Sequence, residues 1–597
     1  MPTTQLPLSK GLGKDYRNAD YVDLLPVNML ATPKEVLNAS GYLRSYPGIQ
    51  KQYDVSGVSR GADFNTAQNA VYRVLGGKLY KANSQVGDVP GSGRVSMACS
   101  YTSQAVAASG AMTLYRYDGT VKTLANWPEQ IITQEGYTRT VKEWSHVTGN
   151  TDFISFVAAD LDGSITLTIT PKTASGVLGA PFIIAEVQWG LQLSQAKPAT
   201  DTPYITALIV KGSKAKGSKI TIEYTFNPNL PTGATDADKV DISLFKAVQV
   251  VPEVAVDYAQ YDIGVVRDIC RARGRYVWVK DGTDTFGITD LSDESHPDQY
   301  SPFYRAESQP DGIQAVDVWR DFVVCFGTST IEYFSLTGAT SVGAALYVAQ
   351  PSLMVSKGIA GTYCKTAFAD TFAFISHQAT GAPSIYVISQ GQVSGIATAT
   401  IEKILRGYLA SELATAVMES TRFDSHELLI IHLPNHVLCY DAAAAQNGAQ
   451  WAILKTGLGD DVYRGIDFMY EGNQITVADK GQSVTGYLKF DISSQYDAQQ
   501  EHLLYTPMFK ANNGRVFDFE LESSTGVSQF AERLFISATA DGINYGREQM
   551  ISANAPFAYD KRVLWRRIGR IRKNIGFKVR IITSSPVTLS DCSVRVE

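Results

Sequence analysis

The sequence predicts an all-β protein in which a β-propeller is interrupted by an inserted β-sandwich-like domain and followed by a C-terminal β-sandwich. At 597 residues the chain is too long for one hydrophobic core, since single cores stop growing at roughly 250–300 residues. Its 49 Gly and 31 Tyr residues favour short strands joined by tight turns. Hairpin-like pairs of apolar runs also recur at intervals of about 40–50 residues, which is the length of a propeller blade.

The first of these hairpins turn at Gly76 and Gly110. Later turns are 45, 54, 54 and 37 residues apart, at positions 282, 327, 381, 435 and 472. We therefore assign an N-terminal arm and the first blades to 1–129, and the remaining blades to 260–502. Apolar positions that repeat with helical spacing predict a connecting helix near 401–419.

The segment 130–259 is expected to be an inserted domain. The turns at Gly110 and Gly282 lie 172 residues apart, and removal of 130–259 restores a step of 42 residues. Stretches such as 164–169 and 219–224 alternate with a period of two, which is typical of strands in a sandwich. From about 503 the blade spacing is lost, so 503–597 is assigned to a separate C-terminal β-sandwich.

The composition excludes several classes of protein. With 53 basic and 59 acidic residues the net charge is −6, so no overall field attracts a phosphate backbone or an anionic membrane. We expect a soluble protein made in a cytoplasm, because the sequence shows neither a signal peptide nor an apolar run of membrane-spanning length. The six scattered cysteines, without a CxxC pair, are expected to be free thiols.

One strongly basic segment, 561–580, contains nine basic residues and no acid. It could form a protein interface, contact DNA, or be the solvated face of a sheet whose apolar residues Ile568, Ile571, Ile575 and Phe577 are buried. The candidate interface or DNA-facing residues are Lys561, Arg562, Arg566, Arg567, Arg570, Arg572 and Lys573.

No catalytic, cofactor or metal site is expected. His426, His432 and His436 lie in one predicted hairpin, but the neighbouring residues complete no known zinc-ligand spacing. No nucleophile elbow and no Ser/His/Asp order is found, and none of the many carboxylates forms a pair that the sequence singles out.

Several stretches resemble the tail-hub, or packaged-DNA stabilisation, proteins of short-tailed phages (podoviruses) of enteric bacteria. The stretches are 5–21, 25–35, 41–48, 281–284, 293–298, 305–312, 329–340 and 565–572. The resemblance covers 1–129 and 260–597 and implies no role for 130–259.

This resemblance implies a structural, non-enzymatic virion protein of the phage tail, made late and assembled in the cytoplasm of the bacterial host. It would form a homo-hexameric hub below the portal and adaptor rings, a head-to-tail connector that closes the DNA channel until genome ejection. The implied partners are the adaptor ring protein, the tail needle, trimeric tailspikes and the packaged double-stranded DNA. No cofactor and no membrane insertion are implied.

Two other functions remain open at this point. A carbohydrate-binding or carbohydrate-cleaving propeller, with 130–259 as a sugar-binding module, predicts glycan binding by the isolated protein. A DNA-binding module that uses 561–580 predicts strong, salt-dependent binding to duplex DNA.

Overall fold

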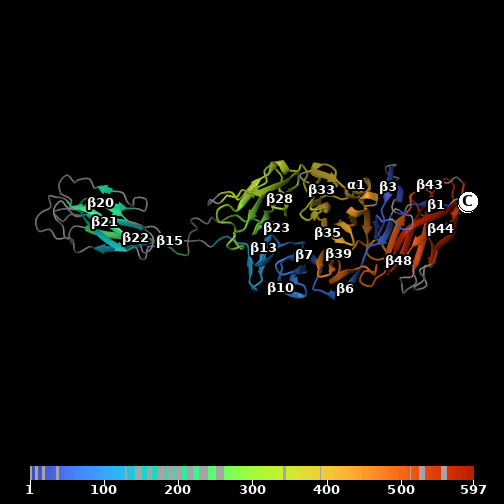
Figure 1. Ribbon diagram of the computed structural model, residues 1–597, viewed down its shortest axis with the longest axis horizontal. Coiled ribbons are helices and arrows are strands. Elements are labelled where there is room, and N and C mark those ends of the chain that lie inside the picture. The colour runs from blue at the N-terminus through green and yellow to red at the C-terminus, as the bar shows by residue number, and fades with distance from the viewer. Residues whose placement is uncertain are drawn as a thin grey trace. The chain divides into compact units, whose positions relative to one another are not determined.

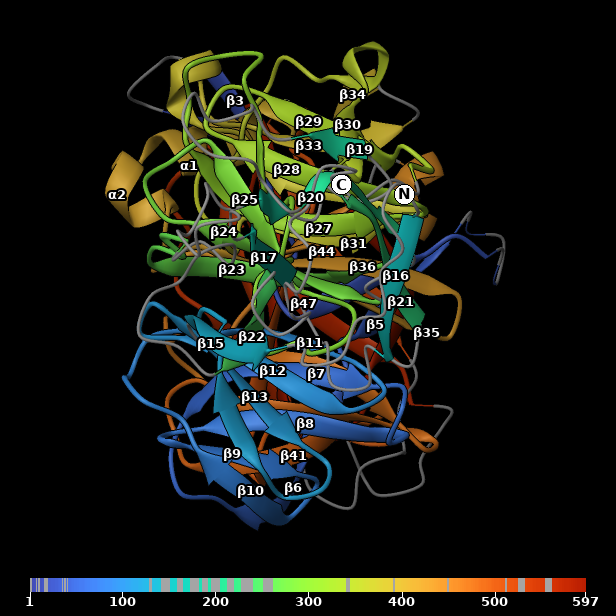
Figure 2. The same cartoon turned by 90° about the vertical axis from the view of Figure 1, so that its left-hand side faces the viewer.

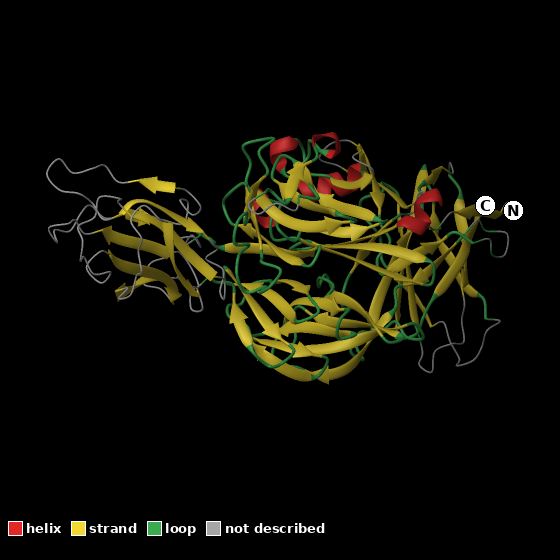
Figure 3. Ribbon diagram, turned by 60° about the vertical axis from the view of Figure 1, so that its left-hand side comes forward, coloured by secondary structure: helices red, strands yellow, loops and turns green. Residues whose placement is uncertain are grey.

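The computed structural model describes two stretches of the chain, 3–127 and 261–596, and the backbone of eight strands between 131 and 250 (Figure 1). The residues not described within the two stretches are 7, 9–10, 16–19, 35, 37–38, 40, 340–343, 390–391, 448–449, 511–512, 524–531 and 553–560. Met1–Ala125 and Asp262–Glu597 form one compact unit, and Asn126–Tyr261 forms a second. Strands dominate both units, and the few helices stand out in Figure 3. In the described part of the chain no helix is long and apolar enough to cross a membrane.

Seven four-stranded antiparallel sheets form the propeller within the described residues of the first unit. The first blade contains β7 (Ser59–Asn65), β8 (Ala70–Leu75), β9 (Lys78–Lys81) and β10 (Ser84–Asp88), the second β11 (Ser96–Cys99), β12 (Ser103–Ala108), β13 (Ala111–Arg116) and β14 (Val121–Thr123), and the third β23 (Val266–Ala272), β24 (Arg275–Lys280), β25 (Thr285–Ile288) and β26 (Phe303–Arg305). The fourth blade contains β27 (Ile313–Trp319), β28 (Phe322–Gly327), β29 (Ile331–Leu336) and β30 (Tyr347–Ala349), the fifth β31 (Lys365–Phe368), β32 (Thr371–Ile375), β33 (Ile385–Ser389) and β34 (Gln392–Gly395), and the sixth β35 (Val417–Phe423), β36 (His426–His432), β37 (Val437–Asp441) and β38 (Trp451–Leu454). The seventh blade contains β39 (Gly465–Glu471), β40 (Gln474–Asp479) and β41 (Val484–Lys489), together with β6 (Gly48–Asp54).

The spacing of the predicted turns reflects these blades, with one exception. The turns near 76, 110, 282, 327, 381 and 435 each join the second and third strands of a blade. The turn at Gly472 instead joins β39 to β40, which are the first and second strands of the seventh blade. The last interval is therefore shorter than a blade.

An N-terminal strand closes the ring. In the seventh blade β6 pairs antiparallel with β41, so that Ile49 faces Leu488, and Figure 2 shows the two strands side by side. The first strand of this blade, β39, also lies against β7 of the first blade. Two distant parts of the chain thus build the seventh blade, which joins the sixth blade to the first.

The segment expected to form one helix over 401–419 differs in the structure. It contains two short helices, α1 (Ala399–Arg406) and α2 (Ala410–Leu413), and β35 already begins at Val417. Gly407 caps the end of α1, and Leu409 has an extended backbone with φ −71° and ψ 157°, which separates the two helices. Ile401 and Leu405 are buried, so the apolar stripe that suggested the helix packs against the fifth and sixth blades.

The β-sandwich is built from both ends of the chain. One sheet contains β4 (Met29–Thr32), β5 (Tyr42–Ser45), β49 (Thr588–Val596), β44 (Arg515–Ser523) and β47 (Val563–Arg570), with β1 (Thr3–Leu6) beside β49; the other contains β42 (Gln500–Tyr505), β48 (Asn574–Thr583), β45 (Arg533–Thr539) and β46 (Gln549–Ser552), with β43 (Phe509–Lys510) beside β48. Phe519 joins the sheets, since its ring lies 5.0 Å from that of Phe577 on the other sheet; on its own sheet it lies 5.9 Å from the ring of Trp565. Figure 1 shows blue β1 among the red C-terminal strands. The N-terminal residues are therefore part of the sandwich and not only an arm; β2 (Gly11–Asp15) and β3 (Asp20–Leu24) form a separate hairpin.

Asn28 fastens the sandwich to the sixth blade. Its amide nitrogen Nδ2 donates to the carbonyl of Glu501 at 2.9 Å, and its Oδ1 accepts from the backbone N–H of Lys455 at 2.9 Å. The residue is buried and has φ 55°, a conformation that Asn tolerates better than most residues. One side chain thus satisfies backbone groups of two domains.

Asn28→Gly is expected to lower the free energy of unfolding by about 2–4 kcal/mol, because glycine keeps the positive φ while two buried backbone groups lose their partner. Urea unfolding measures this loss. The control is Asn69→Gly, at an exposed turn residue with φ 47°, and it should change the stability by less than about 0.5 kcal/mol. Equal effects of the two substitutions would contradict the proposed anchoring.

The second unit consists of two four-stranded antiparallel sheets. The first contains β15 (Ile131–Thr140), β22 (Val240–Val250), β17 (Ile165–Pro171) and β18 (Phe182–Ile184), and the second contains β16 (Thr151–Val157), β21 (Lys219–Phe226), β20 (Ile205–Lys211) and β19 (Gln192–Ser194). Both stretches in which we noted alternation, 164–169 and 219–224, contribute to these strands.

Candidate functional site

The basic candidates lie on and beside an edge strand of the sandwich. β47 is the last strand of its sheet and pairs with β44, and no other described strand pairs with it. All seven candidate side chains are exposed: Lys561, Arg562, Arg566, Arg567, Arg570, Arg572 and Lys573. Ile571, Ile575 and Phe577 are buried in the sandwich core, and Ile568 packs against it. Burial of the apolar residues therefore holds the cations at the surface.

A β-bulge alters the usual alternation of side chains in β47. The register with β44 shifts between Val516 and Asp518, and opposite this shift Arg567 has φ 57°. Arg566 and Arg567 both face solvent as a result. Bulges and charged side chains on an edge strand hinder pairing with a strand of another molecule. The geometry therefore favours contacts through side chains over extension of the sheet.

Most of the basic side chains have no acidic partner. Arg562 donates twice to the carboxylate of Glu520, at 2.5 and 2.6 Å, and this hydrogen bonding lowers the pKa of Glu520. Five cations form no ion pair with any residue that the structure describes: Arg566, Arg567, Arg570, Arg572 and Lys573. These five remain available to an external anion.

A groove of about 540 Å³ runs between the edge strands β46 and β47. Arg562 and Arg566 line it on one side, and the apolar side chains of Met550 and Ile551 line it on the other. Met550 is 58% exposed. The surface thus combines positive charge with an apolar strip.

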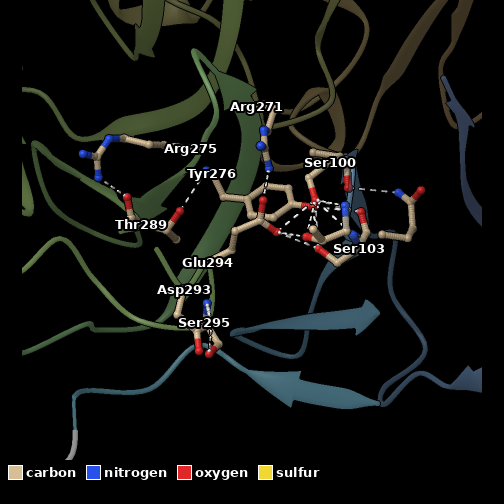
Figure 4. A network of polar contacts seen from close by, with 12 residues as sticks. Ser100, Ser103, Arg271, Arg275, Tyr276, Thr289, Asp293, Glu294 and Ser295 are labelled. Carbon is tan, nitrogen blue, oxygen red and sulfur yellow. Dashed lines mark hydrogen bonds and ion pairs between the residues drawn. The ribbon is translucent and has the colours of Figure 1, made fainter. Parts of the chain in front are cut away.

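A second polar cluster joins the second and third blades, where the chain leaves for and returns from the unit Asn126–Tyr261 (Figure 4). The carboxylate of Glu294 accepts hydrogen bonds from Ser100 at 2.9 Å and Ser103 at 3.0 Å, and it pairs with Arg271 at 2.6 Å. Burial alone would raise the pKa of Glu294, but the hydrogen bond and charge of Arg271 lower it. Glu294 is therefore an ionised bridge between the two blades.

Asp293 continues this bridge. Its carboxylate pairs with Arg116 at 2.6 Å and with Lys122 at 3.1 Å, both on the second blade. Burial opposes ionisation, but hydrogen bonds from Ser295 and the charge of Lys122 lower the pKa of Asp293. These contacts hold the third blade against the second although more than a hundred residues separate the two in the sequence.

Replacement of 128–259 by a short Gly/Ser linker is therefore expected to leave the propeller folded. The ends of the excised segment are close, since Nδ2 of Asn126 donates to the carbonyl of Tyr261 at 2.9 Å. Thermal unfolding of the shortened chain should give a Tm within a few degrees of that of the full chain. The same replacement in a Glu294→Ala background should lower the Tm clearly, because the bridge is then lost. Failure of the first variant to fold would show that the bridge is insufficient.

Three of the stretches that carried the resemblance contain turns that contact one another. The carboxylate of Asp311 accepts from the backbone N–H groups of Ser329 at 2.5 Å and of Thr330 at 3.1 Å. The N–H of Ala306 donates to the carbonyl of Asp284 at 2.9 Å. Three of the stretches, 281–284, 305–312 and 329–340, are thus connected at the third and fourth blades, where they stabilise the loops.

The three histidines of the sixth blade have separate partners. His426 pairs with Asp441 at 2.6 Å, His432 with Glu419 at 2.5 Å, and Nδ1 of His436 lies 2.6 Å from the hydroxyl of Tyr408. Among the described residues no group of His, Cys, Asp and Glu is arranged to hold a metal ion. All six cysteines are free thiols, and five of them are buried.

Comparison with known proteins identifies the family. The family model described as the β-propeller of bacteriophage P22 Gp10 matches residues 4–164 and 229–493, and that of the Gp10 β-sandwich matches 501–597. The tail hub protein gp10 of Salmonella phage P22 is 58% identical over 597 residues, which cover 100% of both chains. The chain belongs to the P22 Gp10 family.

Membership of the P22 Gp10 family confirms several expectations. The chain is an all-β propeller and sandwich protein, a structural component of a phage tail found in the virion, and not an enzyme. One expectation is wrong: the similarity does not stop at 129 and resume at 260, because the propeller match extends to 164 and resumes at 229.

Likeness to solved structures adds nothing to this assignment. An exo-β-1,3-galactanase from Phanerochaete chrysosporium is 8% identical, covers 56% of this chain and 83% of its own, and has a TM-score of 0.22. The extracellular domain of a bacterial one-component system from B. thetaiotaomicron is 9% identical, covers 95% of this chain and 80% of its own, and has a TM-score of 0.24. Both scores are too low to indicate a shared fold.

Proposed function

We propose that the protein forms a homo-hexameric tail hub below the portal and adaptor rings, where it closes the DNA channel and stabilises the packaged genome. The tail needle and the trimeric tailspikes would attach to this hub. The observation that carries the proposal is the 58% identity with the P22 tail hub protein over the full length of both chains.

The architecture supports a load-bearing role. β6 closes the propeller ring, Asn28 ties the ring to the sandwich, and propeller and sandwich belong to one compact unit. A cyclic ring also requires two different complementary faces on each subunit. A rigid subunit can transmit the pressure of packaged DNA from one of its faces to the other.

We assign one of these faces to the basic edge of β47, acting as a protein interface. Arg562 and the unpaired Arg566 border the groove that Met550 and Ile551 also line, and the net charge of −6 of the chain favours contact of these cations with another copy of the chain. Cationic side chains with an apolar centre match the composition of protein interfaces. A DNA contact would need the cations alone, and the exposed Met550 would then have no role.

Electron microscopy of the protein mixed with portal and adaptor rings tests the hub. The expected result is a six-fold layer directly below the adaptor ring. A protein that stays monomeric in the presence of both rings would overturn the proposal.

Arg566→Glu combined with Arg570→Glu is expected to weaken assembly at least tenfold, because two exposed cations of the interface become anions. Analytical ultracentrifugation of the rings measures the loss. The control is Lys510→Glu with Arg533→Glu, which changes the charge equally at two exposed positions of the same sandwich and should assemble normally. If the double variant still assembles but loses salt-dependent binding to duplex DNA, the basic edge of β47 contacts DNA instead.

A further inference from the structure

A bowl of about 620 Å³ opens on the propeller, away from the sandwich edge. Its lining residues lie at the turns between the first and second strands of the fourth to seventh blades, and at the strand ends beside these turns. The volume lies within the range of about 300–1,000 Å³ that small-molecule sites occupy.

Aromatic side chains line the wall and floor of the bowl. Trp319 is half-buried, with Nε1 donating to the carbonyl of Asp370 at 2.8 Å, and its ring stacks on that of Phe322 at 5.9 Å. Tyr470 is 63% exposed on the seventh blade. Phe368 and Phe468 are buried below. Tyr470 therefore presents an exposed aromatic ring to a ligand, beside the partly exposed ring of Trp319.

Charged groups of both signs surround these rings without neutralising one another. Arg422 and Asp370 are exposed and form no ion pair with any described residue. Glu427 accepts a backbone hydrogen bond from Ala369 at 3.2 Å, and the guanidinium of Arg320 lies 4.6 Å from the ring centroid of Trp319. The bowl thus offers strong hydrogen-bond donors and strong acceptors side by side.

We propose that this bowl binds a neutral saccharide. The C–H face of a pyranose ring is apolar and packs on an aromatic ring, while its hydroxyl groups both donate and accept. Asp370 and Glu427 would accept from hydroxyls, and Arg422 would donate to them, in charge-assisted hydrogen bonds. The two carboxylates and the two guanidinium groups give the bowl no net charge, so it does not favour an ionic ligand, and a purely apolar ligand would bury all four charges unpaired.

This binding activity does not rest on hub assembly, and it uses residues far from the basic edge in the sequence. Binding needs no chemical step, and no metal-binding cluster is found among the described residues that line the bowl. The inferred activity is therefore recognition of a sugar by a structural subunit.

Saturation-transfer NMR of the full-length protein with maltotriose, cellotriose and mannotriose, each at millimolar concentration, tests the inference. At least one trisaccharide should receive magnetisation, and calorimetry should then give its affinity. Tyr470→Ala and Arg422→Gln should each weaken binding about tenfold, since both side chains are exposed and their loss leaves the core intact. Tyr300→Ala is the matched control, because Tyr300 is 58% exposed on the third blade, and it should bind as the wild type does.

Three results would overturn the inference. The first is no transfer to any of the three trisaccharides, and the second is binding that survives both Tyr470→Ala and Arg422→Gln. The third is competition by glucose 6-phosphate more strongly than by glucose, which would indicate an anion site. None of these results bears on the hub, which electron microscopy tests separately.

Discussion

Ile49→Asp is expected to open the propeller and to lower the free energy of unfolding by at least about 4 kcal/mol. Ile49 is fully buried in the closing strand β6 and faces Leu488 of β41. The substitution removes apolar contacts and buries a carboxylate without a partner, and each of these effects costs several kcal/mol. Loss of the strand would also expose the paired edge of β41.

Urea unfolding and limited proteolysis measure this effect. The residues that follow β6, near 55–58, should become sensitive to protease in the variant. Gln52→Asp on the same strand is the control, since Gln52 is exposed and the change should alter the stability by less than about 0.5 kcal/mol. A ring that resists protease despite Ile49→Asp would mean that β39–β41 are stable without β6.

Acidification from pH 6.5 to 4 is expected to destabilise the protein, with about 3 kcal/mol of the loss due to His502. Burial lowers the pKa of His502 from 6.5 to about 4. Its Nδ1 lies 3.0 Å from the carbonyl of Asn28, while Nε2 is buried without a partner among the described residues. In the unfolded chain the ring takes up a proton near pH 6.5, but in the folded chain it stays neutral to about pH 4. Stability is therefore complete above pH 6.5 and falls steadily to pH 4.

Urea unfolding at pH 7.5, 6 and 5, at constant ionic strength, measures the slope. Burial also lowers the pKa of His432, which adds to the effect, whereas burial raises the pKa of the neighbouring Glu501, which opposes it. The comparison with His502→Gln isolates the contribution of the His502 imidazole. This variant should be less stable than the wild type at pH 7.5, but its free energy of unfolding should depend less steeply on pH. His377→Gln, in a turn, should keep the slope of the wild type. An unchanged slope in His502→Gln would show that other groups cause the dependence.

Local patterns explain why the propeller could be predicted. Each blade brings its own second-to-third-strand turn, with residues such as Gly76, Gly110 and Gly282 at positive φ, and these turns recur at blade length. The same regularity indicated the inserted unit, because the interval between the turns at Gly110 and Gly282 is much longer than one blade. The helix near 401 was recognised from its apolar stripe, but Gly407 and the extended Leu409 ended it earlier than the stripe suggested.

Long-range pairing explains what could not be predicted. β6 pairs with β41, and β1 pairs with β49, although the paired strands lie far apart in the sequence. Nothing in 48–54 or 3–6 specifies these distant partners. The composition of 561–580 revealed a basic segment, but the sequence did not reveal that this segment lies on a bulged edge strand, because the bulge depends on pairing with β44. The bridge through Glu294 joins polar residues of loops and strand ends, so no periodic signal marks it.

The order of synthesis gives the closing strand a further consequence. β6 leaves the ribosome long before β39, β40 and β41 exist, so it must remain unpaired while the other six blades are made. β1, β4 and β5 wait even longer for the strands of the sandwich that end at Val596. A chain that ends before Lys489 can complete neither domain, and a chain that ends between Lys489 and Val596 lacks strands of the sandwich. Only full-length chains can therefore form both complete domains and enter the assembling particle as a folded subunit.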